Sequence, residues 1–139
     1  QVAIRLLYSI SMDTRFRVIV EQQVISAMQL IIQLIIRSPT KLIDKELAAL
    51  SVNLTWSPTL IKQLCSPENF HHLIKRVHQT FDPLLIKIVR NISQLGEQPI
   101  LFKRYLHELV GMTLKAPSHE FVVESIAVLN NIVLPDGKE

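Results

Sequence analysis

The chain has 139 residues, of which 48% are hydrophobic and 19% are charged, so it is long enough to bury a core of its own. The formal net charge is only +3 and the lysines and arginines form no long run, which argues against a nucleic-acid-binding protein. The single cysteine, Cys65, excludes an internal disulfide, and we expect it to be a small buried side chain in a reducing compartment.

Apolar residues recur at intervals of three and four along the whole chain, which is typical of amphipathic helices. Proline, glycine and capping residues divide this pattern into segments of short, medium and long helix, and this order then repeats. The expected helices, in chain order, span residues 1–12, 14–20, 24–36, 41–56, 59–64, 68–79, 83–94, 101–115 and 121–133.

The most apolar of these segments, residues 24–36, is too short to cross a bilayer, which needs about 20 apolar residues. Ser26, Gln29, Gln33 and Arg37 also fall on one side of such a helix and form a polar stripe. We therefore predict a nearly buried helix and no membrane insertion.

The clearest helix start precedes residues 83–94, because Asp82 can cap the unpaired amides and Pro83 needs no donor in the first turn. The apolar side of this helix is assigned to stacking and contains Leu84, Leu85, Ile88, Val89 and Ile92. Another side presents a basic and amide-bearing edge, formed by Lys87, Arg90 and Asn91.

The ends of the long helices resemble one another: LLYSIS (6–11), LSVNLT (50–55), IVRNIS (88–93) and VLNNIV (128–133). The amide or hydroxyl position in these segments is Ser9, Asn53, Asn91 and Asn131, at separations of 44, 38 and 40 residues. A period of about 40–47 residues with two or three helices is typical of HEAT and armadillo solenoids. One such helical group cannot bury its apolar faces alone, so neighbouring groups must stack.

The fold predicted from this period is an all-α, armadillo-like, right-handed solenoid with about three repeats of a longer array. The chain opens inside an apolar helical pattern without a methionine, so we expect it to be a piece cut from that array. The predicted division is the end of one repeat followed by three repeats, at residues 1–13, 14–57, 58–95 and 96–135.

The Asn-(Leu/Ile)-(Ser/Thr) ending resembles the armadillo repeat, whose third helix lines a concave groove where the asparagine can bind an extended peptide backbone. Importin-α-like proteins carry a tryptophan four residues before that asparagine. Here Arg5, Ala49, Lys87 and Ala127 stand at that position, so we do not expect a nuclear-signal peptide to bind in the same way.

Four stretches resemble the kinesin-associated protein family in order and spacing: YSISMDTRF (8–16), KLIDKELAALSVNL (41–54), DPLLIKIVRNISQ (82–94) and EFVVESIAVLNNIVLPD (120–136). The resemblance implies a non-enzymatic accessory subunit of heterotrimeric kinesin-II, which binds the motor tails and links cargo adaptor proteins. It also implies microtubule-based transport in the cytoplasm and in cilia, including intraflagellar transport.

In this interpretation the groove asparagines hold a partner's backbone, while basic side chains attract its acidic groups; the residues are Asn53, Asn91, Asn131, Lys87, Arg90 and Arg5. Two alternatives stay open at this point. One is an armadillo adaptor of the catenin or importin type that binds other peptides. The other is a structural spacer whose groove binds nothing.

Catalytic and metal-binding motifs are not evident in the sequence. It contains no glycine-rich phosphate loop and no nucleophile elbow, and Glu120 and Glu124 are expected on a solvated helix face or in an N-terminal turn that the helix dipole favours. His71 and His78 lie seven residues apart, which is not a usual metal-ligand spacing, so we expect them to face solvent or to contact a neighbouring repeat. We predict no enzymatic activity, no cofactor, no metal and no small-molecule substrate.

Overall fold

The computed structural model describes residues 2–15, 25–37, 44–55, 57–95 and 99–133, and the regular secondary structure in these ranges is entirely helical. The helices are α1 (Val2–Ser11), α3 (Ile25–Arg37), α4 (Lys45–Leu54), α5 (Pro58–Leu64), α6 (Pro67–Thr80), α7 (Pro83–Gln94), α8 (Pro99–Arg104), α9 (Leu106–Lys115) and α10 (His119–Val133). The predicted all-α solenoid is confirmed.

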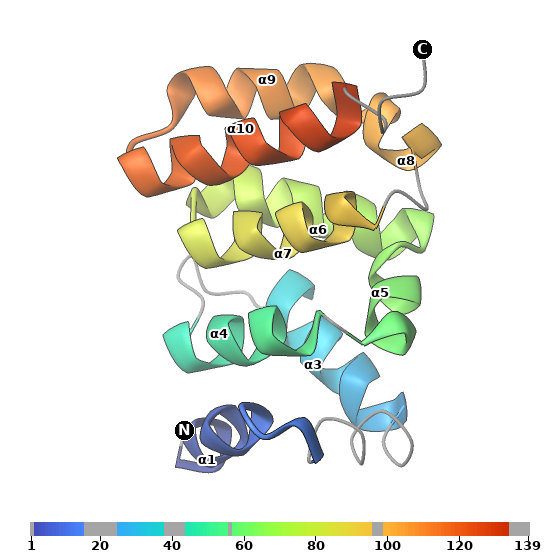
Figure 1. Cartoon of the computed structure of the whole chain (residues 1–139), viewed down its shortest axis with the longest axis vertical. Coiled ribbons are helices and arrows are strands. Elements are labelled where there is room, and N and C mark those ends of the chain that lie inside the picture. Colours follow the sequence, from blue (N-terminus) through green and yellow to red (C-terminus); the bar gives the residue numbers. More distant parts are fainter. Residues whose placement is uncertain (1, 16–24, 38–43, 56, 96–98, 134–139) are drawn as a thin grey trace.

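The helices stack along the long axis of the molecule (Figure 1). Helices α1, α4, α7 and α10 pack on one another in succession, and α4, α7 and α10 begin at the same side of the stack. Behind them lie α3, α6 and α9, while α5 and α8 stand at the opposite edge. The predicted repeat boundaries stay a prediction, and the expected helix 14–20 falls largely outside the described residues.

Three helices begin in the same way, with a capping side chain followed by proline at the first helical position. Ser57, Ser66 and Asp82 cap α5, α6 and α7 in this way. At α7 the Asp82 carboxylate accepts a hydrogen bond of 2.8 Å from the backbone N–H of Leu84, which confirms the predicted start. Each cap satisfies an amide that has no partner within its own helix.

Helix α4 begins later than expected. Instead of starting near residue 41, it starts at Lys45, after Asp44, whose side chain accepts hydrogen bonds from the backbone N–H groups of Glu46 and Leu47. A side-chain hydrogen bond with Glu46, together with these backbone donors, lowers the pKa of Asp44. Residues 41–43 and Trp56, at the ends of the predicted helix, lie outside the described residues.

The single helix predicted for residues 101–115 is wrong, because the chain breaks at Tyr105 into α8 and α9. The Tyr105 ring is buried against Phe70, with ring centroids 5.5 Å apart, and its hydroxyl reaches His71. Pro99, which lies between the expected helices 83–94 and 101–115, is the first residue of α8. The apolar periodicity of residues 101–115 continues through this break, because α8 and α9 both turn apolar residues toward the same core.

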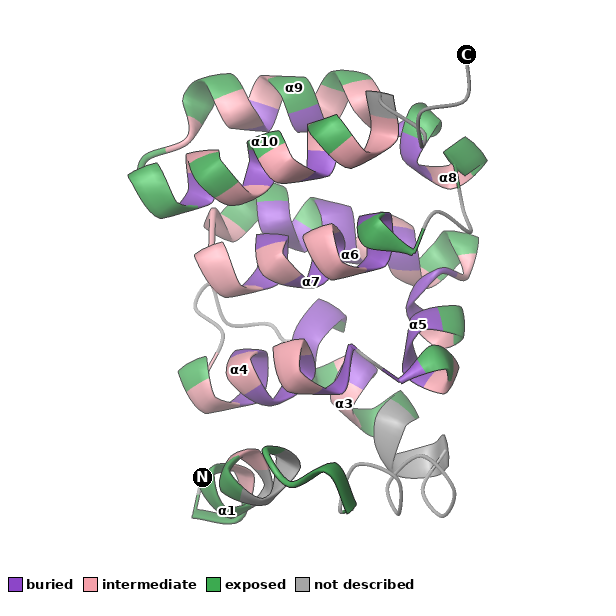
Figure 2. Ribbon diagram, viewed as in Figure 1, coloured by how far each residue is buried: buried purple, intermediate pink, exposed green. Residues whose placement is uncertain are grey.

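One continuous core runs through the stack, and buried residues line the facing sides of successive helices (Figure 2). Helix α7, in the middle, buries the apolar residues Leu85, Ile86, Ile88, Val89 and Ile92. Leu84, assigned to stacking from the sequence, is only half-buried, and Cys65 is buried as expected. In the described part of the chain no helix is long and apolar enough to cross a membrane.

Candidate partner-binding face

The predicted groove asparagines connect one long helix to the long helix before it. Asn91 on α7 donates a hydrogen bond from Nδ2 to Thr55 Oγ1, just after α4, over 2.7 Å. Asn131 on α10 donates in the same way to Ser93 Oγ on α7, over 2.9 Å. Asn53, the equivalent residue of α4, is half-buried and also has an interaction partner. We call each asparagine–hydroxyl pair, Asn91–Thr55 and Asn131–Ser93, a rung.

The hydroxyl of each rung determines how the asparagine is oriented. Thr55 Oγ1 donates its hydrogen to the carbonyl of Val52, and Ser93 Oγ donates to the carbonyl of Arg90. A hydroxyl has one hydrogen, so it can only accept from the asparagine, which must turn its NH₂ toward it. The carbonyl oxygen of Asn91 is then left on the other side of the amide, and it is not a buried atom without a partner. A carbonyl oxygen in this position can accept an O–H from water or an N–H from a bound peptide.

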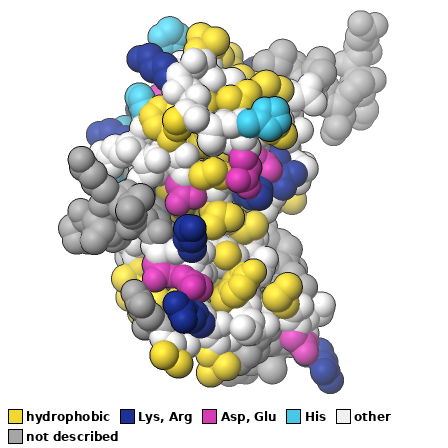
Figure 3. Space-filling model, turned by 90° about the vertical axis from the view of Figure 1, so that its left-hand side faces the viewer, with side chains coloured by type: hydrophobic (Ala, Val, Ile, Leu, Met, Phe, Trp, Pro, Cys, Tyr) yellow, Lys and Arg dark blue, Asp and Glu magenta, His cyan; other side chains and the backbone are white. Residues whose placement is uncertain are grey.

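The three predicted basic residues also contact the next long helix, through carboxylates. Arg5 Nε on α1 lies 3.2 Å from Glu46 Oε1 on α4. Lys87 Nζ on α7 lies 3.1 Å from Glu120 Oε1 on α10. Figure 3 views the side where α4, α7 and α10 begin, and shows acidic and basic side chains in adjacent groups.

The third pair, between Arg90 on α7 and Glu124 on α10, is more enclosed. Arg90 Nε lies 2.7 Å from Glu124 Oε2, and both atoms are shielded from solvent. Only 14% of the Glu124 side chain is exposed. Removing one member of such a pair leaves a poorly solvated charge, whereas an exposed pair contributes little. The expectation that Glu124 lies on a solvated face is therefore wrong.

The face formed by these residues thus has two properties. Its asparagine amides are oriented by the rungs, which turn each NH₂ group toward the preceding long helix, and its positive charges are compensated by carboxylates of the neighbouring helix. An acidic partner would compete with Glu46, Glu120 and Glu124 for the same cations. The role of the six predicted residues in partner binding stays a prediction.

A family model described as kinesin-associated protein matches residues 1–138, which is nearly the whole chain. The chain belongs to the kinesin-associated protein family. This family is an accessory one that associates with kinesin motor subunits, and it is not known as an enzyme family. No solved structure matches the chain.

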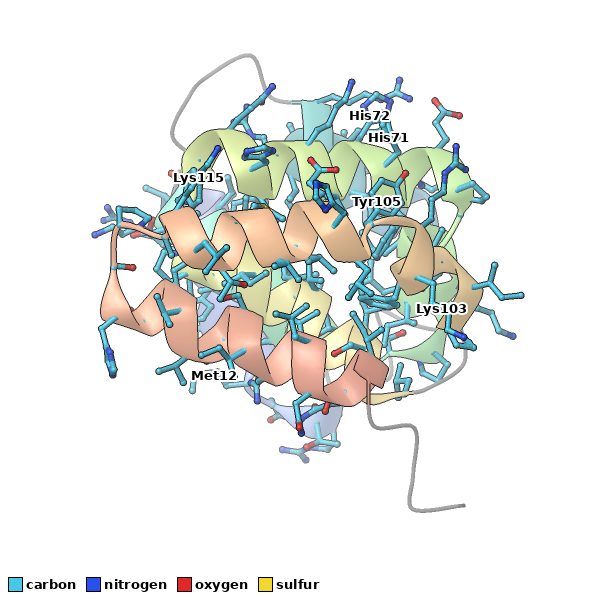
Figure 4. All side chains as sticks on the ribbon, turned by 90° about the horizontal axis from the view of Figure 1, so that it is seen from above. Met12, His71, His72, Lys103, Tyr105 and Lys115 are labelled. Atoms are coloured by element: carbon cyan, nitrogen blue, oxygen red, sulfur yellow. The ribbon has the colours of Figure 1, made fainter. Side chains whose placement is uncertain are left out.

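The layer formed by α3, α6 and α9 has polar contacts of its own, which are made by histidines of α6. His71 Nδ1 lies 2.9 Å from the hydroxyl of Tyr105, and Figure 4 shows the two side chains close together at the corner between α8 and α9. His78 Nδ1 lies 3.1 Å from Glu108 Oε1 on α9. His71 and His78 of α6 therefore both contact the segment from Tyr105 into α9, in agreement with one of the two expectations, a contact with neighbouring helices. Within the described ranges no three His, Cys, Asp or Glu side chains are grouped so that they could hold a metal ion.

Sequence reasoning found one half of each contact and missed the other half. It singled out the asparagines and the basic residues but not their partners, which are Thr55, Ser93, Glu46, Glu120 and Glu124. A signal for some of them was present. Each rung hydroxyl stands two residues after an asparagine of the preceding repeat, within the same aligned hexapeptide.

Proposed function

We propose that this chain is part of the non-motor subunit of a heterotrimeric kinesin-II, where it binds motor tails and links cargo adaptor proteins. The setting would be microtubule-based transport in the cytoplasm and in cilia, including intraflagellar transport. The observation that carries the proposal is the family match over residues 1–138. An extended face with repeated amide and charged groups, on a stack of helices, supports the binding role.

The proposed contact is an extended tail segment lying along α4, α7 and α10. Asn53, Asn91 and Asn131 would hold its backbone, with the side-chain carbonyl oxygen of Asn91 accepting a backbone N–H. Because Thr55 holds the Asn91 amide, its orientation is set before the partner arrives, which lowers the entropic cost of binding. Lys87, Arg90 and Arg5 would attract acidic groups of the segment.

The test of the asparagines compares Asn91→Ala with Thr55→Val in the full-length protein that carries this chain, using affinity for kinesin-II tail segments. Asn91→Ala removes both the rung and the side-chain carbonyl oxygen of Asn91. We expect about 3- to 10-fold weaker binding, which corresponds to the loss of one hydrogen bond with the tail segment. Thr55→Val removes the rung but keeps the Asn91 oxygen, so it should weaken binding less than Asn91→Ala does, through the loss of orientation alone. Equal losses in the two variants would show that Asn91 acts only through the stack.

The test of the basic residues exchanges the charges of one pair, with Lys87→Glu combined with Glu120→Lys. The double variant keeps an ion pair across α7 and α10 but moves the positive charge from one helix to the other. We expect weaker binding of acidic tail segments and unchanged thermal stability. Full retention of tail binding would contradict the assignment of Lys87 to the partner.

A second candidate, the structural spacer, is favoured by one observation. Arg5, Lys87 and Arg90 all meet a carboxylate of the next long helix, so these charges already have a role within the stack. If both tests above leave tail binding intact while the full-length protein still co-purifies with the motor subunits, the spacer is the correct function. Capture of a basic, importin-type peptide would favour the adaptor class instead.

A further inference from the structure

A cleft of about 380 Å³ opens where α3 meets the corner between α5 and α6. It lies on the layer opposite the face that carries Asn53, Asn91 and Asn131, which we call the asparagine face. In Figure 1, α3 and α6 lie behind α4 and α7, and α5 stands at the edge of the stack. The volume lies at the small end of the range for ligand pockets. Five of its six lining residues are polar and uncharged; the full set is Gln29, Ile32, Gln33, Gln63, Ser66 and Asn69.

One wall of the cleft is the polar stripe that the sequence places on residues 24–36. Gln29 and Gln33, one helical turn apart, line the cleft, while Ile32 beside them is buried in the core. The side-chain amides of Gln29 and Gln33 form no hydrogen bond with any described residue. This stripe interrupts an otherwise apolar helix, and nothing in the packing of the described residues requires amides there.

The opposite wall is a fixed corner. Asn69 donates from Nδ2 to the backbone carbonyl of Gln63 over 2.9 Å, and the Ser66 hydroxyl accepts from the backbone N–H of Asn69. These bonds hold the end of α5 against the start of α6. The Oε1 atom of Gln63, a residue that lines the cleft, is buried and has no hydrogen-bond partner, so the free protein leaves this acceptor unsatisfied.

Two charges beside the cleft compensate each other. Arg37, one turn after Gln33, pairs with Glu68 at 2.6 Å, and Glu68 directly precedes Asn69. A charged ligand would find no compensating partner among the lining residues and would lose its hydration, which disfavours carboxylates, phosphates and ammonium groups. Side-chain amides offer donors and acceptors together, which matches a peptide group or another side-chain amide.

We propose that this cleft is a second partner-binding site, which takes an extended, uncharged peptide segment through its main-chain and side-chain amides. On binding, the Gln63 side-chain amide turns so that its unpaired Oε1 accepts an N–H of the segment, and Gln29 and Gln33 pair with the segment from α3. The site is separate from the asparagine face, so a partner here would not compete with one bound along α4, α7 and α10.

The test uses the ¹⁵N-labelled full chain and two capped amino acids, N-acetylglutamine N-methylamide and its glutamate counterpart, at pH 7. Binding of the glutamine probe should shift the side-chain NH₂ signals of Gln63 and Asn69 with millimolar affinity. The glutamate probe should bind at least fivefold more weakly. Absence of shifts, or equal binding of the two probes, would overturn the proposal.

Three variants make the result specific. Gln63→Leu removes an unpaired buried oxygen, so it should fold normally and reduce binding of the glutamine probe at least fivefold. Gln33→Ala should reduce binding independently, from the other wall. Gln79→Leu changes an exposed glutamine of α6 that does not line the cleft, and it should bind the probe like the original chain. If Gln63→Leu and Gln33→Ala bind as tightly as Gln79→Leu, the cleft is not the site.

Discussion

Two contacts between long helices can be compared, α4 with α7 and α7 with α10; we call each contact a joint. The two joints have the same helix packing but different polar contacts. Both have an asparagine rung, Asn91–Thr55 in the first and Asn131–Ser93 in the second. The second joint adds two ion pairs, and Phe81, just before α7, packs on Phe121 with ring centroids 5.3 Å apart. Among the described residues no ion pair connects α4 with α7.

The difference follows from two positions in the repeat. One residue before the aligned asparagine, α7 has Arg90, the partner of Glu124, where α4 has Val52. Seven residues before it, α10 has Glu124 where α7 has Leu84. The amide rung therefore recurs at both joints, whereas charge pairing requires a basic helix followed by an acidic one. An uncharged hydrogen bond can form at every joint of a repeat array. An ion pair forms only where the neighbouring helix carries the opposite charge, so it makes one helix a preferred neighbour of another.

The largest expected effect on the free energy of unfolding comes from removing the aromatic side chain of Phe121, which belongs to the second joint only. Phe121 is fully buried between α7 and α10, so Phe121→Ala should lower the free energy of unfolding by about 3–5 kcal/mol. Amide hydrogen exchange should accelerate in α9 and α10 more than in α4. Val123→Ala, at a half-exposed position of the same helix, is the control and should stay within about 0.5 kcal/mol. Uniform acceleration along the stack would mean that the joints do not open independently.

A smaller effect distinguishes the two ion pairs of the second joint. Glu124→Gln should lower the free energy of unfolding by about 1.5–3 kcal/mol, because it leaves the shielded Arg90 without a countercharge. Glu120→Gln should cost less than about 1 kcal/mol, since 58% of the Glu120 side chain is exposed. Urea denaturation at low and high salt measures both, and only the Glu120 effect should fade with salt. Equal costs would contradict the difference in burial.

The sequence predicted the arrangement along the chain better than the contacts across it. The capped start at Asp82 and the recurring asparagines depend on neighbouring residues and on a period, and both can be recognised from the sequence alone. The break at Tyr105 depends on contacts with Phe70 and His71, which are more than thirty residues away in the sequence. The local periodicity of the sequence therefore could not predict it. The same limit explains why Lys87 was assigned to a partner while Glu120, its neighbour in space, was assigned to solvent.

The smallest effect tests whether the rungs of the two joints are equivalent. Asn91→Ala and Asn131→Ala should each cost about 0.5–1.5 kcal/mol, the net value of one hydrogen bond, despite the different charges around them. A double-mutant cycle with Thr55→Val for the first rung and Ser93→Ala for the second isolates each bond from the other contacts of its asparagine. Similar coupling energies would confirm that the amide rung contributes the same at every joint. A second rung stronger by more than about 1 kcal/mol would show that the neighbouring ion pairs reinforce it, as expected for cooperative polar networks.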